Sequence, residues 1–259
     1  MKTIILCGGT GTRLREETEF KPKPMIKIGG VPILIHIMNH YAYYGHKEFI
    51  LCLGYKSEMI KEYFLNLSKL NNDFEMNISN GQITCLKKCI NYDYKIIFAE
   101  TGEVTPTAER ITMVSKYLDE DLFMITYGDG VSTVNINKLI NFHKKQEVKF
   151  KTHVTISTVH PSSKYGKVKS DKNNLIKEFS EKPVLDDYIN GGFMVFNRNG
   201  IKYLKKGEML EESLTRMTKS KRVSQFKHDG FWHSMDTMKD VEELNKLWEK
   251  EKPWAIWEN

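Results

Sequence analysis

A glycine- and threonine-rich segment near the start of the chain, residues 8–12, has the composition of an anion-binding loop. An apolar run (TIILC) precedes the segment, and Arg13 follows it directly. Backbone N–H groups that are exposed where a strand gives way to the next element can bind phosphate oxygen atoms. The segment therefore indicates a phosphate site. A tight turn without a ligand is the alternative interpretation.

Two well-known phosphate-binding motifs do not fit this loop. A dinucleotide-binding loop requires the pattern G-x-G-x-x-G, but residues 12–14, which follow Gly9-Thr10-Gly11, contain no glycine. The acidic residue that would bind the ribose about twenty positions further on is also missing. The P-loop is excluded because no Gly-Lys-Ser/Thr sequence follows. An NAD(P)-dependent oxidoreductase is therefore disfavoured.

The segment Lys21-Pro22-Lys23-Pro24 adds two positive charges close behind the loop. Proline fixes its own φ and pushes the preceding residue toward an extended conformation. We therefore expect Lys21 and Lys23 to point in nearly the same direction and to be held over the loop. The alternative is a solvated, charged turn.

Asp129 is a candidate metal ligand because of the strand that precedes it. Residues 122–127 are apolar and predict a buried strand, and Asp129 stands between two glycines just beyond its C-terminal end. Ligands of open α/β sheets bind at this edge. A carboxylate beside closely approachable backbone suits a Mg²⁺–phosphate complex. A simple Asp-Gly turn is the alternative.

The elements that must position these residues alternate between strands and helices. Apolar runs at residues 3–7 and 47–54 predict strands, and segments 31–45 and 57–70 predict helices, the second capped by Ser57. Asn80-Gly81 predicts a β-hairpin turn, and residues 165–197 are typical of short strands and turns. This order predicts an α/β fold with a Rossmann-like, doubly wound, mostly parallel mixed sheet and a small β-rich part.

Composition excludes several classes of function. The 259 residues are 40% hydrophobic and 28% charged, as in an ordinary globular domain. The formal net charge of +6 is spread along the chain, so we expect no nucleic-acid partner. No apolar segment approaches the ~20 residues of a membrane helix, and no signal peptide is visible. We therefore expect no membrane partner and a cytoplasmic location.

The segment LCGGTGTRL…KPKPM resembles the signature of the sugar-nucleotide pyrophosphorylases, nucleotidyltransferases that join a nucleoside triphosphate to a sugar 1-phosphate. Its longer form, GTGTRL-x-EET-xx-KPKPM-xx-IGG-x-PI with GFW-x-x-MDT near the end, is similar to the glucose-1-phosphate cytidylyltransferases of that family. The resemblance covers nearly the whole chain. It implies the nucleotide-diphospho-sugar transferase fold, CTP and glucose 1-phosphate as substrates, Mg²⁺ as cofactor, and a homo-oligomer (trimer or hexamer).

The resemblance also implies direct in-line displacement that yields CDP-glucose, used in deoxysugar and O-antigen (lipopolysaccharide) synthesis, and pyrophosphate. The chain contains no recognisable nucleophile–base pair. This absence fits the implied reaction, because a phosphate monoester with a second pKa near ~6 is largely a dianion at neutral pH and needs no general base. Positioning and charge neutralisation dominate such transfers.

The resemblance assigns roles to particular residues. It implies that Asp129 and Asp236 hold the metal and that Arg13, Lys23, Asp129 and Lys182 are catalytic. The residues implied in nucleotide binding are Leu6, Cys7, Gly8, Gly9, Thr10, Gly11, Thr12, Arg13, Lys23, Thr105, Arg110 and Gly128. Those implied in sugar binding are Gly166, Glu181, Lys182, Asn190, Gly191 and Gly192. We expect a single domain, 1–259, with a nucleotide-binding part at about 1–130, a sugar-binding part at about 131–240 and a helical tail at 240–259.

Some alternatives stay open at this point. Ala108-Glu109 stands where the cytidylyltransferase pattern has glycines, which leaves the base and sugar preference undecided. A nucleotidyltransferase that uses another nucleoside triphosphate or another phosphorylated substrate is one alternative. A non-catalytic nucleotide-sugar sensor is another, although a sensor has no need of two metal-binding aspartates. Glu16 and Glu17 have no role that physical reasoning supplies.

Overall fold

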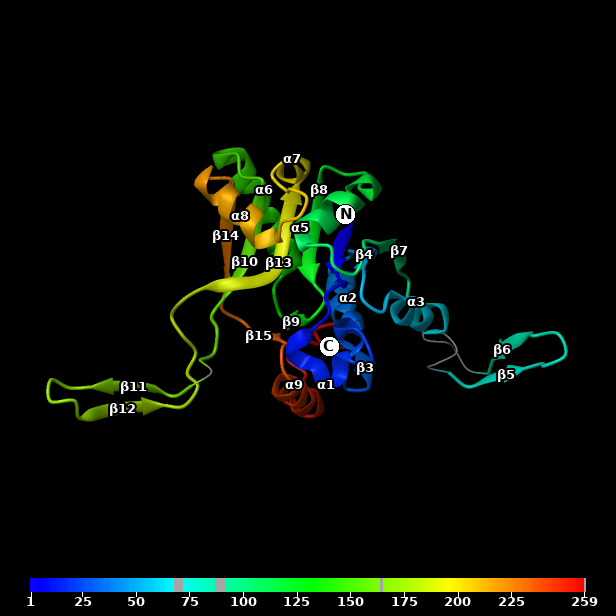
Figure 1. Ribbon diagram of the computed structural model, residues 1–259, viewed down its shortest axis with the longest axis horizontal. Helices are drawn as coiled ribbons and strands as arrows, with labels where there is room; N and C mark the ends of the chain where they lie inside the picture. The colour runs from blue at the N-terminus through cyan, green and yellow to red at the C-terminus, as the bar shows by residue number, and fades with distance from the viewer. Residues whose placement is uncertain (68–71, 87–91, 164, 259) are drawn as a thin grey trace.

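The computed structural model describes residues 1–67, 72–86, 92–163 and 165–258, except for the side chains of Arg13 and Arg15. Its centre is a seven-stranded sheet in the order β14-β10-β13-β8-β1-β4-β7 (Figure 1). All neighbours in this sheet are parallel except the two pairs that β13 forms, with β8 and with β10, so the predicted mostly parallel mixed sheet is confirmed. The strands are β1 (Thr3–Leu6), β4 (Glu48–Leu53), β7 (Lys95–Glu100), β8 (Leu122–Tyr127), β10 (Val154–Val159), β13 (Ile189–Asn197) and β14 (Val223–His228).

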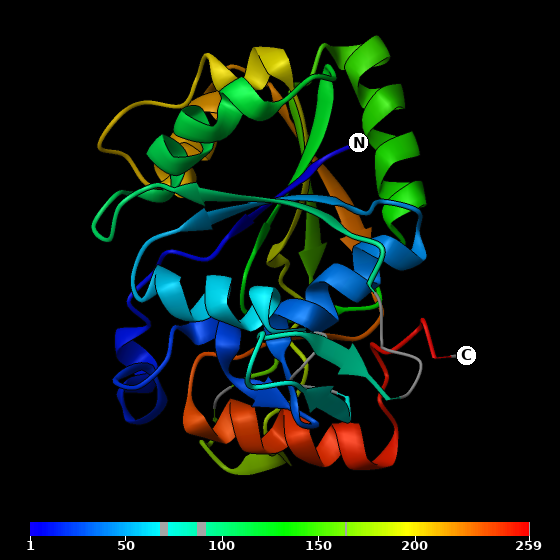
Figure 2. The same ribbon diagram turned by 90° about the vertical axis from the view of Figure 1, so that its right-hand side faces the viewer.

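Helices pack on both faces of the sheet because its central strands are apolar on both sides. Along β1, Ile4 belongs to one hydrophobic cluster and Ile5 to the other, as the alternation of side chains in a strand requires. In Figure 2, α9 (Met238–Lys250) lies along the lower edge of the body, opposite α7 (Arg198–Ile201). The cluster of Ile5 receives α2 (Ile33–Tyr43), α3 (Ser57–Leu65), α6 (Ile136–Phe150) and α9 (Met238–Lys250), and that of Ile4 receives α5 (Thr107–Val114) and α8 (Leu210–Lys219).

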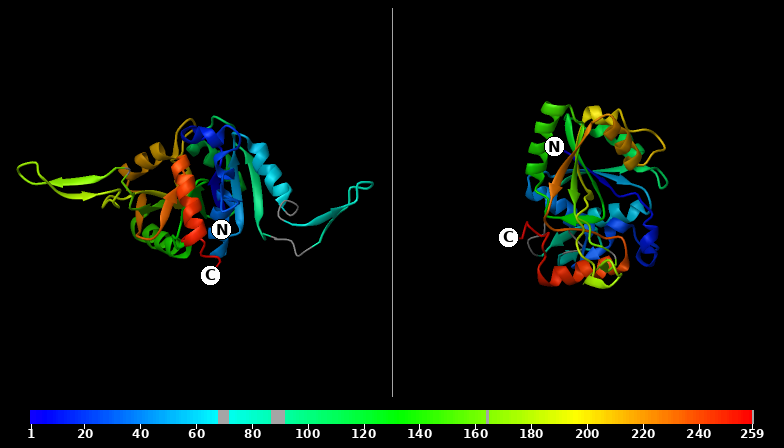
Figure 3. Two further views of the ribbon diagram at one scale, coloured as in Figure 1. Left: turned by 90° about the horizontal axis from the view of Figure 1, so that it is seen from below. Right: turned by 90° about the vertical axis from the view of Figure 1, so that its left-hand side faces the viewer.

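Four two-stranded sheets accompany the main sheet within the described ranges. Two are hairpins that project from the body in opposite directions, β5 (Phe74–Met76) with β6 (Ile83–Cys85) and β11 (Lys167–Ser170) with β12 (Ile176–Ser180) (Figures 1 and 3). The first contains the predicted Asn80-Gly81 turn. The other two are β2 (Lys27–Ile28) with β3 (Val31–Pro32) and β9 (Gly130–Ser132) with β15 (Trp232–Ser234). The short helical elements are α1 (Arg15–Thr18), η1 (Thr12–Leu14), η2 (Lys23–Met25) and η3 (Ser115–Tyr117).

Two predicted helices differ from the structure at their ends. The first begins at Ile33 and not at residue 31, because Val31 and Pro32 form β3. The second has Lys56 as its N-cap, with a left-handed φ of 49°, so the predicted Ser57 cap is wrong. The Ser57 hydroxyl instead donates to the carboxylate of Glu100. The helix ends at Leu65, and the predicted residues 68–70 lie outside the described ranges.

The proposed division into a nucleotide-binding part, a sugar-binding part and a helical tail stays a prediction. No helix within the described ranges combines the length and the apolar composition needed to cross a bilayer.

Candidate active site

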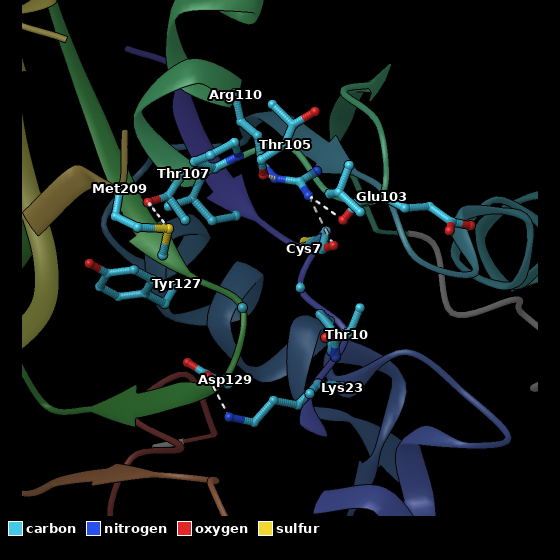
Figure 4. A pocket seen from close by; sticks show the side chains of 18 residues that line it. Cys7, Thr10, Lys23, Glu103, Thr105, Thr107, Arg110, Tyr127, Asp129 and Met209 are labelled. Carbon is cyan, nitrogen blue, oxygen red and sulfur yellow. Dashed lines mark hydrogen bonds and ion pairs between the residues drawn. The ribbon is translucent and has the colours of Figure 1, made fainter. Parts of the chain in front are cut away.

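A cavity of about 470 Å³ opens at the C-terminal ends of β1 and β8 (Figure 4). The glycine loop forms one wall, the segment 103–107 with Arg110 forms another, and residues 127–129 complete it together with Lys23, Pro24 and Met209. Of the predicted nucleotide-binding residues, Thr12 does not line this cavity, and the Arg13 side chain lies outside the described atoms. All the others do line it. This is the edge where open α/β sheets bind ligands.

Lys23 brings the two predicted metal-binding residues together. Its Nζ atom lies 2.7 Å from Oδ2 of Asp129 and 2.8 Å from Oδ1 of Asp236. The Lys23 side chain is only 14% exposed, and the two carboxylates are 29% and 36% exposed. Burial by itself would lower the pKa of Lys23, but the Asp129 and Asp236 carboxylates raise it above its ordinary value. The ammonium group is therefore held in its charged form.

A small sheet explains how aspartates from distant parts of the sequence meet. Asp129 immediately precedes β9, and Asp236 closely follows β15, which pairs with β9 in antiparallel register. The backbone N–H of Met235 also donates to the Asp129 carbonyl at 2.8 Å. Ser234 Oγ donates to Oδ2 of Asp236 at 3.1 Å, which fixes that carboxylate.

The two aspartates fit a hard divalent cation. Their carboxylate oxygens already converge on one cationic atom, the Nζ of Lys23. Within the described part of the chain, no group of three or more His, Cys, Asp or Glu side chains could hold a metal ion. The protein thus offers two carboxylates, and water and substrate phosphates would supply the remaining ligands, as is usual for Mg²⁺.

Arg110 joins the glycine loop to the opposite wall of the cavity. A guanidinium group has five N–H donors, and each of them is used here. Burial lowers the pKa of Arg110, and its hydrogen-bond acceptors are neutral oxygen atoms. Nε donates to Thr105 O, Nη1 to Leu53 O and Thr101 Oγ1, and Nη2 to Gly8 O and Glu103 O. Arg110 lines the predicted nucleotide site, but the structure uses its donors to tie the walls together.

Two glycines of the loop are required for steric reasons. A Cβ atom on Gly8 would lie 2.0 Å from Nη1 of Arg110, whereas a Cβ on Gly9 would meet nothing within 4 Å. Gly11 has a φ of 63°, and its Cβ would lie 2.6 Å from Cγ2 of Thr18. The loop therefore needs glycine at positions 8 and 11 for its shape, and position 9 has room for a side chain.

The expectation that Lys21 and Lys23 point the same way is wrong. η2 begins at Lys23, so the segment is not extended throughout and the alternation of side chains does not apply. Lys21 instead forms an ion pair with Glu17 at 2.6 Å, one turn earlier in the sequence. This contact gives Glu17 a role that the sequence did not supply.

None of the predicted sugar-binding residues lines the cavity. Gly192 has a φ of 84°, and its Cβ would come 2.9 Å from the ring of Tyr127, which precedes the Gly128-Asp129 pair. Gly191 O accepts a hydrogen bond from the Trp232 indole at 2.8 Å. The Asn190 side chain accepts from the Gly192 N–H at 2.9 Å.

The second group of predicted sugar-binding residues comes from the segments that flank β11 and β12. A Cβ on Gly166 would lie 3.2 Å from Oε2 of Glu181, so these two residues are neighbours. Lys182 has a left-handed φ of 47°, and its side chain lies near that of Lys239 in the first turn of α9.

Sequence reasoning missed several residues that line the cavity. Tyr127 and Met209 are among them. Tyr127 could have been found from its place at the end of the strand before Asp129. Met209 could not, because its position depends on contacts between α5 and α8, such as the Leu210 N–H to Thr107 Oγ1 bond of 2.7 Å. The unusual Ala108 and Glu109 do not face the cavity, since Ala108 is buried in the core and Glu109 accepts from the Gly207 N–H.

The chain is similar to known proteins over nearly its whole length. The Nucleotidyl transferase family pattern matches residues 2–251. The chain is 40% identical to the probable glucose-1-phosphate cytidylyltransferase of Bacillus subtilis (strain 168), over 99% of this chain and 100% of that protein. It is 38% identical to the glucose-1-phosphate cytidylyltransferase of Salmonella typhimurium over the full length of both. A crystal structure of UDP-glucose pyrophosphorylase with UDP-glucose superposes with a TM-score of 0.67 at 16% identity, covering 96% of this chain and 98% of the other.

The fold, the loop and the sequence match define the class of protein. The chain belongs to the nucleotidyl transferase family, and it is a nucleotidyltransferase.

The contrast between Gly8 and Gly9 gives a direct test of the loop geometry. We expect Gly8→Ala to lower the free energy of unfolding by about 1–3 kcal/mol, because the new methyl group collides with Arg110. Gly9→Ala is the matched control and should unfold at the wild-type temperature. Thermal denaturation followed by circular dichroism measures both. Equal melting temperatures for the two variants would contradict the steric argument.

Proposed function

We propose that this chain is a glucose-1-phosphate cytidylyltransferase, which transfers the cytidylyl group of CTP to α-D-glucose 1-phosphate and releases CDP-glucose and pyrophosphate. The observation that carries the proposal is the convergence of Lys23, Asp129 and Asp236 at the edge of a glycine-loop cavity. Full-length identity of 38% and 40% to relatives with this name supports the choice of base and sugar. We place the enzyme in the cytoplasm, where CTP is available.

The proposed reaction needs alignment and charge neutralisation more than acid–base chemistry. Glucose 1-phosphate is already largely a dianion at neutral pH and can attack the α-phosphorus of CTP directly. We assign the backbone N–H groups of residues 8–12 and the Arg13 side chain to the β- and γ-phosphates that leave. Lys182 would bind the incoming sugar phosphate, and Gly166, Glu181 and Asn190 to Gly192 would contact the sugar.

Mg²⁺ is the divalent cation that we propose for Asp129 and Asp236. When bound, it would neutralise charge on the phosphates and polarise their oxygen atoms. Lys23 now occupies the position between the two carboxylates. A competing cation would release its ammonium group, which the same side chain could then place on the α-phosphate.

Arg110 fixes the wall of the cavity to which we assign the base. Its N–H donors are all used within the protein, so binding of the base does not depend on them. Thr105 and the other residues of segment 103–107 form the wall that faces the glycine loop. We assign the cytosine to this wall. The Ala108-Glu109 departure does not weaken this assignment, because neither residue lines the cavity.

We also propose that the enzyme is a homo-oligomer, a trimer or hexamer, assembled through the β11–β12 hairpin. Val168 and Phe179 are cross-strand partners on one face of this hairpin and are 48% and 64% exposed. The hairpin projects from the body, so the rest of its own chain does not cover this apolar face (Figure 1). Exposed apolar patches of this kind commonly mark contacts between proteins.

The activity is tested by pyrophosphate release with Mg²⁺ across four nucleoside triphosphates and several sugar 1-phosphates. We expect CTP with glucose 1-phosphate to give the highest kcat/KM. A higher value with another pair would identify a different nucleotidyltransferase. No release with any pair would support the sensor interpretation and overturn the proposal.

Lys23 and Asp129 are tested against Lys21. We expect Lys23→Ala and Asp129→Ala each to lower kcat by about 100-fold or more, the usual effect of removing a group that stabilises transition-state charge. Lys21→Ala is the matched control from the same segment, because Lys21 pairs with Glu17 at the surface and should change kcat by less than about twofold. Wild-type far-ultraviolet circular dichroism in all three shows that the fold is kept. Near-normal turnover in both test variants would refute their catalytic assignment.

The assembly is tested by light scattering after size-exclusion chromatography. We expect the wild type to have three or six times the 30.2 kDa mass of one chain. The double variant Val168→Ser/Phe179→Ser should have a smaller mass because it removes the apolar face. Lys169→Ser/Glu178→Ser is the control, since these residues form an ion pair on the other face of the same hairpin. A monomeric wild type, or equal masses for the two double variants, would overturn the proposed interface.

A further inference from the structure

Strand β13 contains a bulge near its start. The pairing of β13 with β10 shifts in register between Ile156 and Thr158, so that three residues of β13, 191–193, stand opposite one residue of β10. Gly192 in this β13 bulge has a φ of 84°, a backbone conformation that glycine adopts without strain. A bulge bends its strand and changes the direction of the residues around it. The start of β13, where three of the predicted sugar-binding residues stand, is therefore bent out of the regular ladder.

Tyr127 supports the β13 bulge from the neighbouring strand. β13 pairs with β8 as far as Met194, which stands opposite Ile125. The same register, if continued, places Gly192 opposite Tyr127. The Tyr127 ring lies directly against Gly192, where a Cβ atom would come 2.9 Å from the ring atom Cδ2. The Tyr127 hydroxyl donates to the carboxylate of Glu211 in α8, so the far end of the ring is fixed as well.

Trp232 supports the same bulge from a second segment. Its indole Nε1–H donates to Gly191 O at 2.8 Å. Trp232 belongs to β15 and pairs with Ser132 of β9. Its Nε1 atom also lies 4.0 Å from the place that a Cβ atom on Gly130 would take. The indole therefore connects the bulge to the residue that follows Asp129.

Two further contacts leave the bulge little room to move. Gly191 packs against β10, where a Cβ atom would lie 3.0 Å from Cγ1 of Val159 and 3.1 Å from the carbonyl oxygen of Ser157. Oδ1 of Asn190 accepts from the Gly192 N–H at 2.9 Å, which closes the turn within the bulge. The position of the bulge is therefore set by β10, Tyr127 and Trp232 together.

Both supporting residues come from the segments that carry the aspartates of the site. Tyr127 stands two residues before Asp129 and lines the same cavity (Figure 4). Trp232 stands four residues before Asp236. The two aspartates meet at Nζ of Lys23, at 2.7 and 2.8 Å. The β13 bulge is therefore held by the same two segments that form this centre.

We infer that Tyr127 and Trp232 are positioning residues of the acceptor site, which hold the β13 bulge at a fixed place relative to Asp129 and Asp236 and thereby orient the sugar 1-phosphate. This inference rests on the proposed function and deepens it. In that function the sugar contacts the bulge while its phosphate lies next to the two aspartates. The orientation of the substrate then depends on the distance between bulge and aspartates, and a misplacement of about 1 Å can slow a reaction about 100-fold.

The test uses Tyr127→Phe, which removes only the hydroxyl, and Trp232→Phe, which removes the indole donor. Tyr117→Phe and Trp257→Phe are the matched controls, because Tyr117 lies in η3 and Trp257 lines a different cavity. Glucose 1-phosphate is titrated by calorimetry in the presence of Mg²⁺ and a CTP analogue with a methylene group between the α- and β-phosphates, which cannot transfer. We expect each test variant to weaken binding about tenfold, as the loss of a hydrogen bond that leaves its partner unsatisfied implies, and the controls to leave it unchanged. In turnover, the test variants should raise the KM for glucose 1-phosphate and leave the KM for CTP unchanged.

Glu211 provides a second test of the same contact. Glu211→Ala removes the acceptor of the Tyr127 hydroxyl and should weaken the binding of glucose 1-phosphate as Tyr127→Phe does. Glu211→Gln keeps an amide oxygen as acceptor and should restore most of the affinity. The double variant Tyr127→Phe/Glu211→Ala should bind no more weakly than either single variant, because both changes remove one hydrogen bond.

Three outcomes would overturn the inference. The first is wild-type affinity and KM for glucose 1-phosphate in both Tyr127→Phe and Trp232→Phe, and CDP-glucose formation by these variants would then leave the proposed function intact. The second is an equal rise of the KM values for both substrates, which would show a general loss of structure. The third is failure of the wild type to bind glucose 1-phosphate. A wild type that binds it but forms no CDP-glucose would refute only the proposed function, because calorimetry still decides the roles of Tyr127 and Trp232.

Discussion

The site depends on one ammonium group held between two carboxylates. Lys23, Asp129 and Asp236 come from three distant segments, and without the lysine the two half-buried carboxylates would repel each other across a short distance. The lysine therefore allows the site to form before any metal or nucleotide is present. Separating one of these side chains from the others would leave a buried charge without a partner, which is costly. The ion pairs therefore hold the three segments together at one point.

The rest of the fold brings these three residues together. The parallel strands β1 and β8 end together, which sets the glycine loop beside Asp129. The antiparallel pair of β9 and β15 then returns the C-terminal part of the chain to the same edge and delivers Asp236. The cap of α9 fixes the first turn of that helix to Asp236. The two strand pairings are made by backbone hydrogen bonds, whereas the cap of α9 depends on the side-chain carboxylate of Asp240.

The sequence predicted much of this, for reasons that differ from residue to residue. The alternation of apolar runs predicted the sheet, and a strand that ends in Gly-Asp-Gly predicted Asp129, because both signals are local. Asp236 could be assigned only by resemblance, because its partner lies across a strand pairing that no local pattern reveals. The direction of Lys21 was wrong because a 3-10 turn begins at Lys23. Met209 could not be predicted, because its position depends on the packing of α5 against α8, which are far apart in the sequence.

The five hydrogen bonds of Arg110 have a consequence for how this class of protein can change over time. Four of its acceptors are backbone carbonyls, at Gly8, Leu53, Glu103 and Thr105. A backbone carbonyl is present whatever the side chain, so residues 103 and 105 can be substituted freely without loosening the wall. The side chains of the wall to which we assign the base are thereby separated from the bonds that hold their loop. Under this assignment, a new base preference can arise by substitution in this wall while the glycine-loop half of the cavity keeps its shape.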